Sequence, residues 1–455
     1  MKKLLFHSYH FPPIGGSGAQ RPLKMVRHLA RLGYESLVLT GGGATADRWA
    51  PEDSTLLAKV PEGVEIRRVN SDGEPRLSAG WRRAGERWLG LEDRWAAWWA
   101  DSSDRLGREV GADCDLIYVW MQPYASAEAG ANLSRRLGIP WVADLGDPWA
   151  LDENMIFASA VHRSRALNRM GELLGTAAAI VMATPEAVDR LLHAFPAFAD
   201  RPVVSIANGF EAADFEHKPS ARGDGKFRIV HTGYLHTEIG EQHRRRRLLR
   251  WAMRAAPTGL DILTRSHLFL VDAVNQLIDE DPGLEQVLEL QLAGVLTDAD
   301  RRVASRCKVA RIRGYMTHAE SVELMQSADL LFLPMHNLPP GVRATIVPGK
   351  TYEYLASETP ILAAVPDGDA RDILEQAGNA LIVRPDDVDG IAAAIRGEVQ
   401  RVRAGGETRR PDPNVVARFE YGRLAAELAA VFDKVLEREA APAPIAAQEG
   451  ASNQR

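Results

Sequence analysis

The segment VPGKTYEYLASETPILAAVP, residues 347–366, joins a helix start to a buried strand and decides the fold of the second half of the chain. It places Gly349 and Lys350 where the helix is expected to begin, and Glu353 one turn later. Unpaired backbone N–H groups and the positive end of the helix dipole favour a phosphate at such a start. An acidic side chain one turn further on can accept hydrogen bonds from ribose hydroxyls. The spacing fits a nucleoside diphosphate, and it also fits an ordinary amphipathic helix with an early lysine.

Around this segment, apolar runs of strand length alternate with longer stretches of helical periodicity. This alternation is typical of a parallel sheet with helices on both faces, and it occurs twice. We therefore predict an α/β protein with two Rossmann-like doubly wound domains and an interdomain cleft at the carboxyl ends of their strands. The expected strands lie near residues 4–7, 36–40, 116–119, 141–144 and 180–183, then 227–231, 261–263, 288–293, 310–313, 330–334, 360–364 and 380–383.

The length of 455 residues also favours two domains. A strong turn signal, Asn208–Gly209, follows the first set of strands. We expect an N-terminal domain over 1–205, a C-terminal domain over 206–413, a helix over 414–439 that folds back across the cleft, and a disordered tail over 440–455.

Composition excludes several classes of protein. Hydrophobic residues make up 45% and charged residues 25%, as in a soluble globular protein, and no apolar run approaches the roughly 18 residues of a membrane span. The start of the chain, MKKLLFHSYHFPP, is too short in apolar residues for a signal peptide. Two distant cysteines, Cys114 and Cys307, suggest neither a disulfide framework nor a cysteine metal site, which fits the cytoplasm. A net charge of −6 gives no general attraction to nucleic acid.

A glycine-rich loop follows the first expected strand, in the stretch HFPPIGGSGAQRPLKMVRHLARLGYESLVLT of residues 10–40. Glycines let the backbone approach a ligand closely, and the helix after them can direct N–H groups at an anion. The loop differs from the G-x-G-x-x-G order, and the next strand ends at Thr40–Gly41 without a ribose-binding acid, so NAD binding is disfavoured. A tight turn that merely needs glycine remains the alternative. The candidate donor-binding residues here are Gly15, Gly16, Ser17 and Gly18.

Taken in order, five segments resemble glycosyltransferase family 4: residues 10–35, DLGDPW at 144–149, NGF at 208–210, HAESVELMQSADLLFLP at 318–334, and PGKTYEYLASETPILAAVPDGDARDIL at 348–374. The resemblance covers most of residues 1–435. It implies a GT-B fold and sugar transfer from a nucleotide donor with retention of anomeric configuration, without a metal or other cofactor. It also implies that the donor sits mainly on the C-terminal domain and the acceptor mainly on the N-terminal one.

On the donor side, the resemblance assigns Glu353 to the second glutamate of the family's paired-glutamate signature, which holds the donor ribose. The first glutamate would stand where this chain has Thr345, so the acid that contacts the sugar hydroxyls in relatives is absent. Lys350 matches a lysine of the PGK-type branch, and Arg343 precedes the same helix; either could neutralise the diphosphate. The remaining matched donor-side residues are Thr232, Gly233, Gly314, Tyr315, Met316 and Gly349.

A further departure concerns a basic pair that many relatives carry after the glycine turn at Gly233. Here the loop is YLHTEIGEQHRRRR, residues 234–247. Its run of Arg244 to Arg247 could substitute for that pair, or it could form a solvated helix face.

On the acceptor side, the resemblance points to Asp144 and Asp147, just after a strand. Relatives often carry an arginine between these acids, where this chain has Gly146. Asp147 before Pro148 could equally cap a helix or turn. The segment Met121–Glu128 follows another strand and could line an acceptor pocket, although a histidine common there in relatives is absent.

Five tryptophans crowd into residues 81–99, at Trp81, Trp88, Trp95, Trp98 and Trp99. On a helix they would share one face, because residues seven apart drift by only about 20°. Such a face could lie at a membrane interface and reach a lipid-linked acceptor. Packing against the core of the first domain is the alternative.

The leading interpretation is a cytoplasmic retaining glycosyltransferase of cell-surface polysaccharide or glycoconjugate biosynthesis. Such an enzyme could also bind peripherally at the inner face of the membrane. Lys350, Arg343 and the N–H groups near Gly349 would stabilise the leaving diphosphate in a closed cleft. Two other interpretations stay open: a non-catalytic GT-B protein that binds a partner or a sugar nucleotide, and a sugar-nucleotide epimerase. The base, the sugar, the acceptor and the oligomeric state are not encoded in a recognisable motif.

Overall fold

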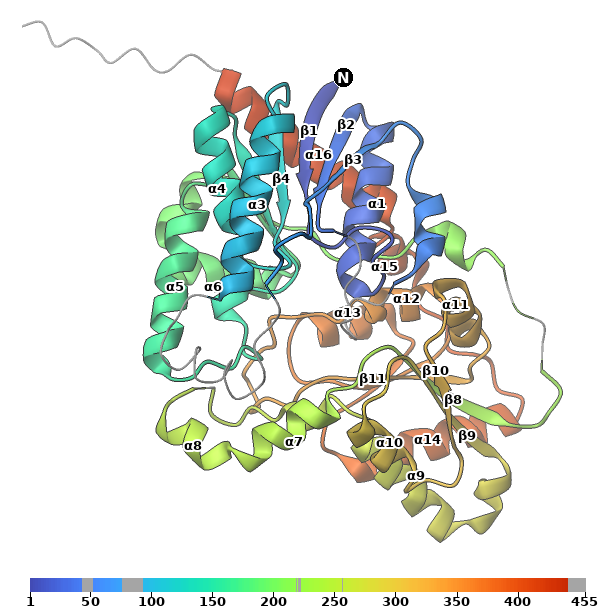
Figure 1. Cartoon of the computed structure of the whole chain (residues 1–455). Helices are drawn as coiled ribbons and strands as arrows, with labels where there is room; N and C mark the ends of the chain where they lie inside the picture. Colours follow the sequence, from blue (N-terminus) through green and yellow to red (C-terminus); the bar gives the residue numbers. More distant parts are fainter. Residues whose placement is uncertain (43–51, 76–92, 218, 220–221, 256, 441–455) are drawn as a thin grey trace, which may run out of the picture.

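The computed structural model describes residues 1–42, 52–75, 93–217, 219, 222–255 and 257–440. In this part of the chain two α/β domains lie one above the other, each with a central parallel sheet between helices (Figure 1). The prediction of a doubly wound two-domain α/β fold is therefore confirmed.

The first sheet has the strand order β3-β2-β1-β4-β5-β6-β7, and every neighbouring pair is parallel. Its order reverses between β1 and β4, the switch point where open α/β sheets bind ligands. Its strands are β1 (Lys2–His7), β2 (Tyr34–Thr40), β3 (Glu65–Arg68), β4 (Leu116–Trp120), β5 (Trp141–Leu145), β6 (Ala179–Met182) and β7 (Val203–Ser205). Its helices are α1 (Ser17–Arg31), α3 (Arg94–Val110), α4 (Ser126–Leu137), α5 (Ala160–Leu174) and α6 (Pro185–Ala194).

The second sheet repeats this plan with the order β10-β9-β8-β11-β12-β13. It too is parallel throughout and reverses between β8 and β11. Its strands are β8 (Phe227–Thr232), β9 (Leu288–Ala293), β10 (Ala310–Gly314), β11 (Leu330–Pro334), β12 (Ile361–Ala364) and β13 (Ala380–Val383). The helices around it are α7 (Thr237–Arg245), α8 (Arg247–Ala252), α9 (Leu268–Glu280), α10 (Asp298–Ala304), α11 (His318–Gln326), α12 (Lys350–Ala356), α13 (Asp369–Ala377) and α14 (Val388–Arg403).

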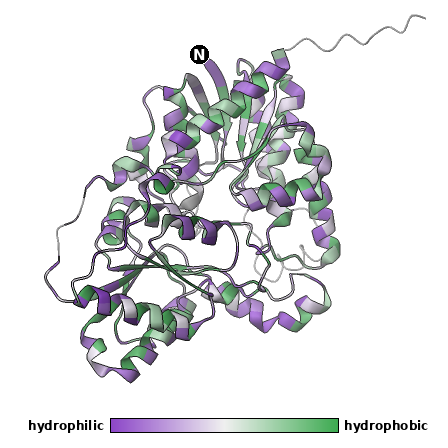
Figure 2. Ribbon diagram, turned by 180° about the vertical axis from the view of Figure 1, so that it is seen from behind, coloured by the Kyte–Doolittle hydropathy of each residue, from purple (hydrophilic) through white to green (hydrophobic). Residues whose placement is uncertain are grey.

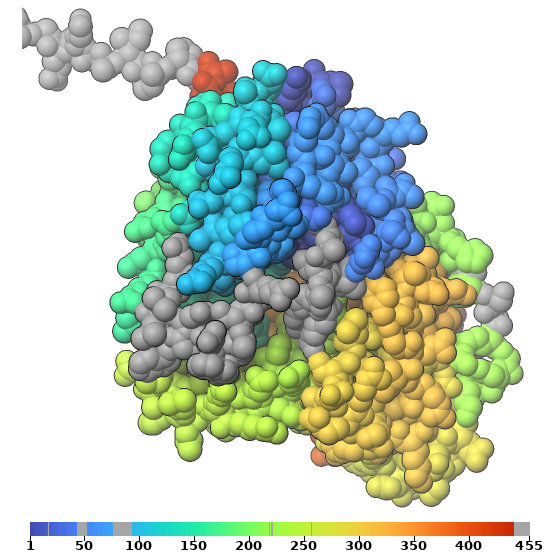
Figure 3. All heavy atoms as spheres, in the orientation of Figure 1, coloured from blue at the N-terminus to red at the C-terminus, as the bar shows by residue number. Residues whose placement is uncertain are grey.

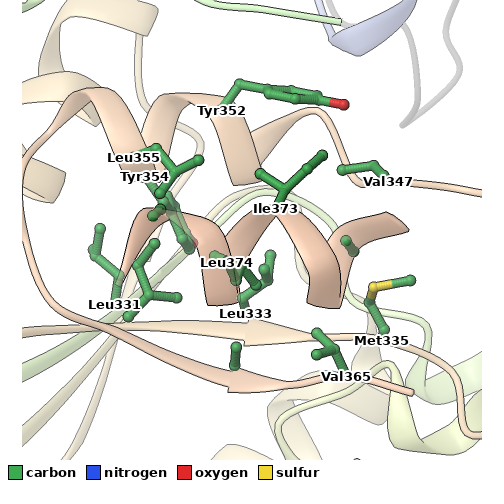
Figure 4. Close-up of a cluster of buried hydrophobic side chains, with 14 of the residues drawn as sticks. Leu331, Leu333, Met335, Val347, Tyr352, Tyr354, Leu355, Val365, Ile373 and Leu374 are labelled. Atoms are coloured by element: carbon green, nitrogen blue, oxygen red, sulfur yellow. The ribbon is translucent and has the colours of Figure 1, made fainter. Parts of the chain in front are cut away.

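Apolar side chains fill both faces of each sheet, because strands covered by helices on both sides must bury alternate residues in opposite directions. Figure 2 shows the strands as mainly green and the outward helix surfaces as largely purple. In the second domain, Tyr354 and Leu355 of α12 point towards Leu331 and Leu333 of β11 (Figure 4). This packing fixes the rotation of α12, and it leaves Glu353 half-buried on another side of the helix.

The chain passes between the domains twice, and the two passages pair with each other. The N–H of Phe210 donates to the carbonyl of Phe419 (3.0 Å), and the N–H of Tyr421 donates back to the carbonyl of Phe210 (3.0 Å). After α15 (Pro413–Ala417), the long helix α16 (Tyr421–Ala440) returns to the first domain and packs against α1. Leu424, Leu428 and Phe432 of α16 are buried there. Residues 441–455 of the expected tail lie outside the described residues.

One expected strand is wrong. Residues 261–263 begin a short 3₁₀ helix, Ile262–Thr264, because the carboxylate of Asp261 accepts a hydrogen bond from the N–H of Leu263 (3.1 Å) and caps it. The edge strand β3 was not expected, since its residues are half-exposed or exposed and carry no apolar run.

Candidate functional site

The two domains meet through loops that follow the carboxyl ends of their strands. The hydroxyl of Thr184, after β6, donates to the carbonyl of Thr345, after β11 (2.6 Å). The N–H of Glu186 at the start of α6 donates to Asp369 at the start of α13 (2.9 Å). These contacts hold the loop that leads to Lys350 against the first domain.

Lys350 starts α12 and reaches the glycine turn after β8. A Cβ built on Gly233 would lie only 2.7 Å from Lys350 Nζ, so the absence of a side chain at Gly233 leaves room for the ammonium group. Lys350 has no hydrogen-bond or ion-pair partner among the described residues. Burial and repulsion by Arg265 lower its pKa to about 7, and Glu353 opposes part of that decrease.

The glycines at this edge of the sheet hold a tightly packed backbone. Gly233 and Gly294 have φ values of 100° and 136°, and a Cβ on Gly294 would lie 2.4 Å from the Gly233 carbonyl oxygen. The N–H of Gly294 donates to the carbonyl of Gly314 (2.7 Å), whose φ is 77°. Side chains are strained or excluded at Gly233 and Gly294, so the backbone itself lines this part of the site.

Arg265 is a site residue that the sequence analysis missed. It follows the 3₁₀ helix Ile262–Thr264, and its guanidinium interacts electrostatically with Asp147 and Glu153 of the first domain. No ion pair of Arg265 shorter than 4 Å occurs in the described part of the chain, and burial lowers its pKa. Arg265 and Lys350 are thus two half-buried cations without a direct counter-ion, close enough to repel each other.

The arginine run proposed as a substitute pair lies elsewhere. Arg244 is paired with Asp261 (Nη2–Oδ2 2.5 Å), and Arg245, Arg246 and Arg247 are exposed. The segment that contains α7 and α8 separates Gly233 from Arg265 by 32 positions, which hides Arg265 from a local motif search.

Arg343 and Glu353 have partners already. The guanidinium of Arg343 contacts Glu186 (3.0 Å), Asp369 (3.3 Å) and Asp372 (2.6 Å), and these pairs raise its pKa. Arg343 therefore bridges the domains, and its role at a diphosphate stays a prediction. Glu353 lies 3.8 Å from Nδ1 of His318 and is partly exposed, so its carboxylate is accessible to a ligand.

Glu153, also missed by the sequence analysis, contacts Thr345, the residue at which the resemblance would put the first signature glutamate. Its carboxylate accepts hydrogen bonds from the N–H (2.9 Å) and the hydroxyl (2.5 Å) of Thr345. It also contacts His336 Nε2 (3.1 Å) and Arg190 (3.2 Å). Burial opposes its ionisation, but the hydrogen bonds from His336 and Thr345 outweigh burial and lower the pKa of Glu153 to about 2.

Asp144 is enclosed within the first domain. Its carboxylate is fully buried, accepts the Tyr118 hydroxyl (2.6 Å) and pairs with Arg21 of α1 (Nη2–Oδ2 2.9 Å). Arg21 also donates to the carbonyl of Ala207 in the linker (2.5 Å). This geometry gives Asp144 the place of a counter-ion beneath the linker, and direct contact with an acceptor stays a prediction.

Asp147 lies in a different environment, beside an aromatic pair. Trp149, two residues on, has a positive φ of 50° and stacks on Tyr124 with ring centroids 5.2 Å apart. Burial raises the pKa of Tyr124, as does the charge of Asp147. Burial also raises the pKa of Asp147, and the positive charge of Arg265 opposes part of that increase. Burial, together with the carboxylates of Asp147 and Glu153, raises the pKa of Asp152 to about 7. A carboxylate beside a flat aromatic surface suits a sugar hydroxyl and its ring.

The remaining candidates occupy the expected loops. Gly15 and Gly16 precede α1, Ser17 is its first residue, and a Cβ on Gly18 would touch His10 at 3.0 Å. Thr232 ends β8, and its N–H donates to the Tyr354 hydroxyl (3.0 Å). Gly349 precedes α12 in open space, Tyr315 is 46% exposed after β10, and Met316 packs against the core. Their binding roles stay predictions.

Three of the five clustered tryptophans belong to the interior or its margin. Trp99 is fully buried and its indole N–H donates to Ser126 (2.9 Å), while Trp95 donates to Glu74 (2.9 Å). Trp98 is partly buried against the same core. Trp81 and Trp88 lie outside the described residues. Among the helices that the structure describes, none has the length and apolar composition needed to cross a membrane.

One group of possible metal ligands lies apart from this region, at the linker. One ligand atom each of His28, Glu211 and Glu420 lie within 4.8 Å of one another. Lys24 and Arg27 already approach the Glu211 carboxylate (3.8 and 3.7 Å), so cations balance its charge.

Comparisons with solved structures identify the class of this fold. Crystal structures of HepE from Anabaena, bound to UDP and glucose, and of a glycosyltransferase from Rickettsia africae match with TM-scores of 0.59 and 0.61. Their identities are 15% and 11%; the matches cover 95% and 96% of this chain, and 100% and 99% of theirs. The α,α-trehalose 6-phosphate synthase of Burkholderia multivorans matches at 12% identity and a TM-score of 0.60, over 97% of this chain and all of its own. The fold is therefore GT-B.

Residues 262–400 match the family model of glycosyl transferases group 1. This match starts beside Arg265 and includes Lys350 and Glu353, so it spans the candidate donor side. The C-terminal domain thus resembles glycosyl transferases group 1 over these residues. A comparison with curated protein sequences gave no match.

Proposed function

We propose that this protein is a retaining glycosyltransferase that moves a sugar from a nucleoside-diphosphate sugar to a hydroxyl acceptor. The observation that carries the proposal is the pair formed by Lys350 and Arg265, two half-buried cations without a direct counter-ion among the described residues. Holding two like charges together is costly, and a diphosphate between them would remove that cost.

The neighbouring backbone supports a diphosphate at this position. Gly233 gives Lys350 Nζ room against the main chain, and Gly294 packs directly behind it. In group transfer the leaving diphosphate gains negative charge as the donor carbon becomes cation-like. Positioned cations in a site shielded from water stabilise that charge, and Lys350 and Arg265 are the side chains placed to do so.

Within this proposal, the donor is a uridine diphosphate sugar. The solved structures of HepE contain UDP, UDP with glucose, and UDP-glucose. Glu353, exposed enough for contact and one turn beyond Lys350, would accept hydrogen bonds from the ribose. By the same family analogy, the departing phosphate takes the acceptor proton on the face that it leaves.

The acceptor binds between Asp147 and the stacked pair of Tyr124 and Trp149 in this proposal. The strained backbone of Trp149 supports it, because such strain concentrates at functional sites. We propose a saccharide or glycolipid acceptor of cell-surface polysaccharide biosynthesis. A cytoplasmic location is consistent with Cys114 and Cys307, which are both buried and free.

Calorimetric titration of UDP, GDP, ADP and TDP into the wild type, Lys350→Met and Arg265→Met tests the donor site. We expect selective binding of UDP that each variant weakens at least about tenfold, or roughly 1.4 kcal/mol. Lys434→Met and Arg105→Met are matched controls that should bind UDP like the wild type. Both side chains are exposed, on α16 and α3, which pack on the first domain. Absence of binding by every nucleotide would contradict the proposal and favour a non-catalytic GT-B protein. Isomerised sugar and free UDP formed without acceptor would instead favour an epimerase.

A further inference from the structure

The short helix α8 carries an exposed group of large apolar side chains. Leu248, Leu249 and Trp251 are 83%, 63% and 71% exposed, and none of the residues of α8 is buried. In Figure 1, α7 and α8 form a projecting segment at the lower left, below α5, and in Figure 3 the yellow-green atoms of this region form the lower left margin of the molecule. Large apolar side chains gathered on one exposed segment are typical of an interaction surface.

An exposed apolar residue of the first domain, Val161, adjoins α8. The N–H of Ala160 donates to the carbonyl of Met253 (3.1 Å), and that of Phe157 donates to the carbonyl of Ala255 (3.2 Å). These bonds hold the end of α8 against the start of α5, where Val161 is 59% exposed. We call Val161, Leu248, Leu249 and Trp251 the α8 surface.

The segment that carries α8 is rich in positive charge. Residues 242–260 contain six arginines, at positions 244–247, 250 and 254, and no aspartate or glutamate. Arg244 is paired with Asp261, and Arg245 approaches Glu241 at 3.8 Å, but Arg246, Arg247 and Arg254 are exposed without an ion pair among the described residues. This local excess stands against a net charge of −6 for the whole chain.

A solvated helix face would account for the arginines alone but not for the exposed Leu248, Leu249 and Trp251. Tryptophan and leucine inserted at the headgroup level, with arginines on the same segment, are the chemistry of a helix that lies on an anionic bilayer. The tryptophans of α3 do not compete for this role, because Trp95, Trp98 and Trp99 pack against the core of the first domain.

We propose that the α8 surface docks this protein on a membrane that carries anionic lipid. The arginines attract the lipid headgroups, and the three large side chains of α8 enter the interface. α7 connects this surface to the site, since the N–H of His236, just before α7, donates to the carbonyl of Arg265 (2.9 Å). Docking would therefore hold the interdomain region close to the bilayer. The proposal does not depend on the transfer reaction, and its test needs no turnover.

The test is flotation of the purified full chain with vesicles of equal parts phosphatidylglycerol and phosphatidylcholine, beside vesicles of phosphatidylcholine alone. We expect binding to the anionic vesicles only, weakened by added salt because salt screens the attraction of the arginines. Substituting Leu248, Leu249 and Trp251 together by Ser should lower the partition coefficient at least about tenfold. The double substitution Arg246→Glu, Arg247→Glu should lower it similarly by removing the attraction.

The matched control replaces three other exposed residues, Leu32, Leu57 and Val402, by Ser, and it should bind like the wild type. Thermal unfolding of every variant shows whether it folds; all changed side chains are exposed, so we expect unchanged midpoints. Equal flotation of the α8 variant and the wild type would overturn the proposal. So would equal binding to neutral vesicles, or a dimer in solution that the α8 substitutions dissociate without any vesicle binding.

Discussion

The carboxylate of Glu153 accepts two hydrogen bonds from Thr345, one from its N–H (2.9 Å) and one from its hydroxyl (2.5 Å), across the boundary between the domains. By the family resemblance, Thr345 stands at the position of the first signature glutamate, and Glu153 from the other half of the chain places an acid beside it. Because this carboxylate is buried and fully engaged, its effect on a ligand would pass through the loop that leads to Lys350.

Replacing Glu153 by Gln should lower the free energy of unfolding by on the order of 2 kcal/mol. The charged hydrogen bonds to His336 and Thr345 would weaken while the shape is kept. Urea denaturation measures the change. Thr345→Val removes the hydrogen bond from the hydroxyl and keeps the one from the backbone N–H, so it should lower the free energy of unfolding by less. An equal loss in both variants would contradict the stabilising role given to the whole Glu153 network.

The stabilising effect of Glu153 should depend on pH in the acid range. Its pKa in the folded protein, about 2, lies below the ordinary glutamate value of 4.5, so the folded state releases the proton more readily than the unfolded state. Glu153→Gln should therefore lower the unfolding free energy most above about pH 5. This difference from the wild type should shrink as the pH falls towards 2. Denaturation curves at several acid pH values should show this convergence.

Binding of UDP should take up protons above neutral pH. The pKa of Lys350 is lowered to about 7, and a bound diphosphate would raise it. Affinity should thus fall as the pH rises above about 7, and calorimetry at about pH 8 in buffers of different ionisation enthalpy should show proton uptake. In Lys350→Met this uptake should disappear; uptake of the same size in the variant would assign it to another group.

Gly233→Ala should abolish UDP binding. The new Cβ would lie 2.7 Å from Lys350 Nζ at a φ of 100°, so the ammonium group must move. Gly63→Ala is the matched control for strain alone, because Gly63 has a φ of 85° and no atom near its added Cβ. Calorimetry of both variants separates the two effects, and unchanged binding in Gly233→Ala would place the diphosphate elsewhere.

Tyr124→Ala and Trp149→Ala should lower the rate of transfer while leaving UDP affinity within about twofold. In the proposed site both rings lie on the acceptor side, and neither is among the groups that interact electrostatically with Lys350 or Arg265. A loss of at least about tenfold in kcat/KM for the acceptor is expected. Weakened UDP binding in these variants would show that the aromatic pair belongs to the donor side.

Much of the fold was predictable because parallel strands buried on both faces are continuous apolar runs, and Leu330–Pro334 and Ile361–Ala364 are found where such runs were seen. Lys350 was also visible, since the start of a helix leaves a local signature. Arg265 and Glu153 were not. The helices α7 and α8 separate Arg265 from the glycine turn at Gly233. Glu153 meets Thr345 across 192 positions of sequence, a contact that only the folded chain creates.

The return of α16 to the first domain has a consequence for how the protein is made. Leu428 and Phe432 complete the apolar layer over α1, yet they are translated after the entire second domain. The first half of the chain therefore leaves the ribosome with that layer open, and it can close only after α16 has been synthesised. A fragment that stops at the linker would keep this surface exposed and would be expected to need a chaperone or to aggregate.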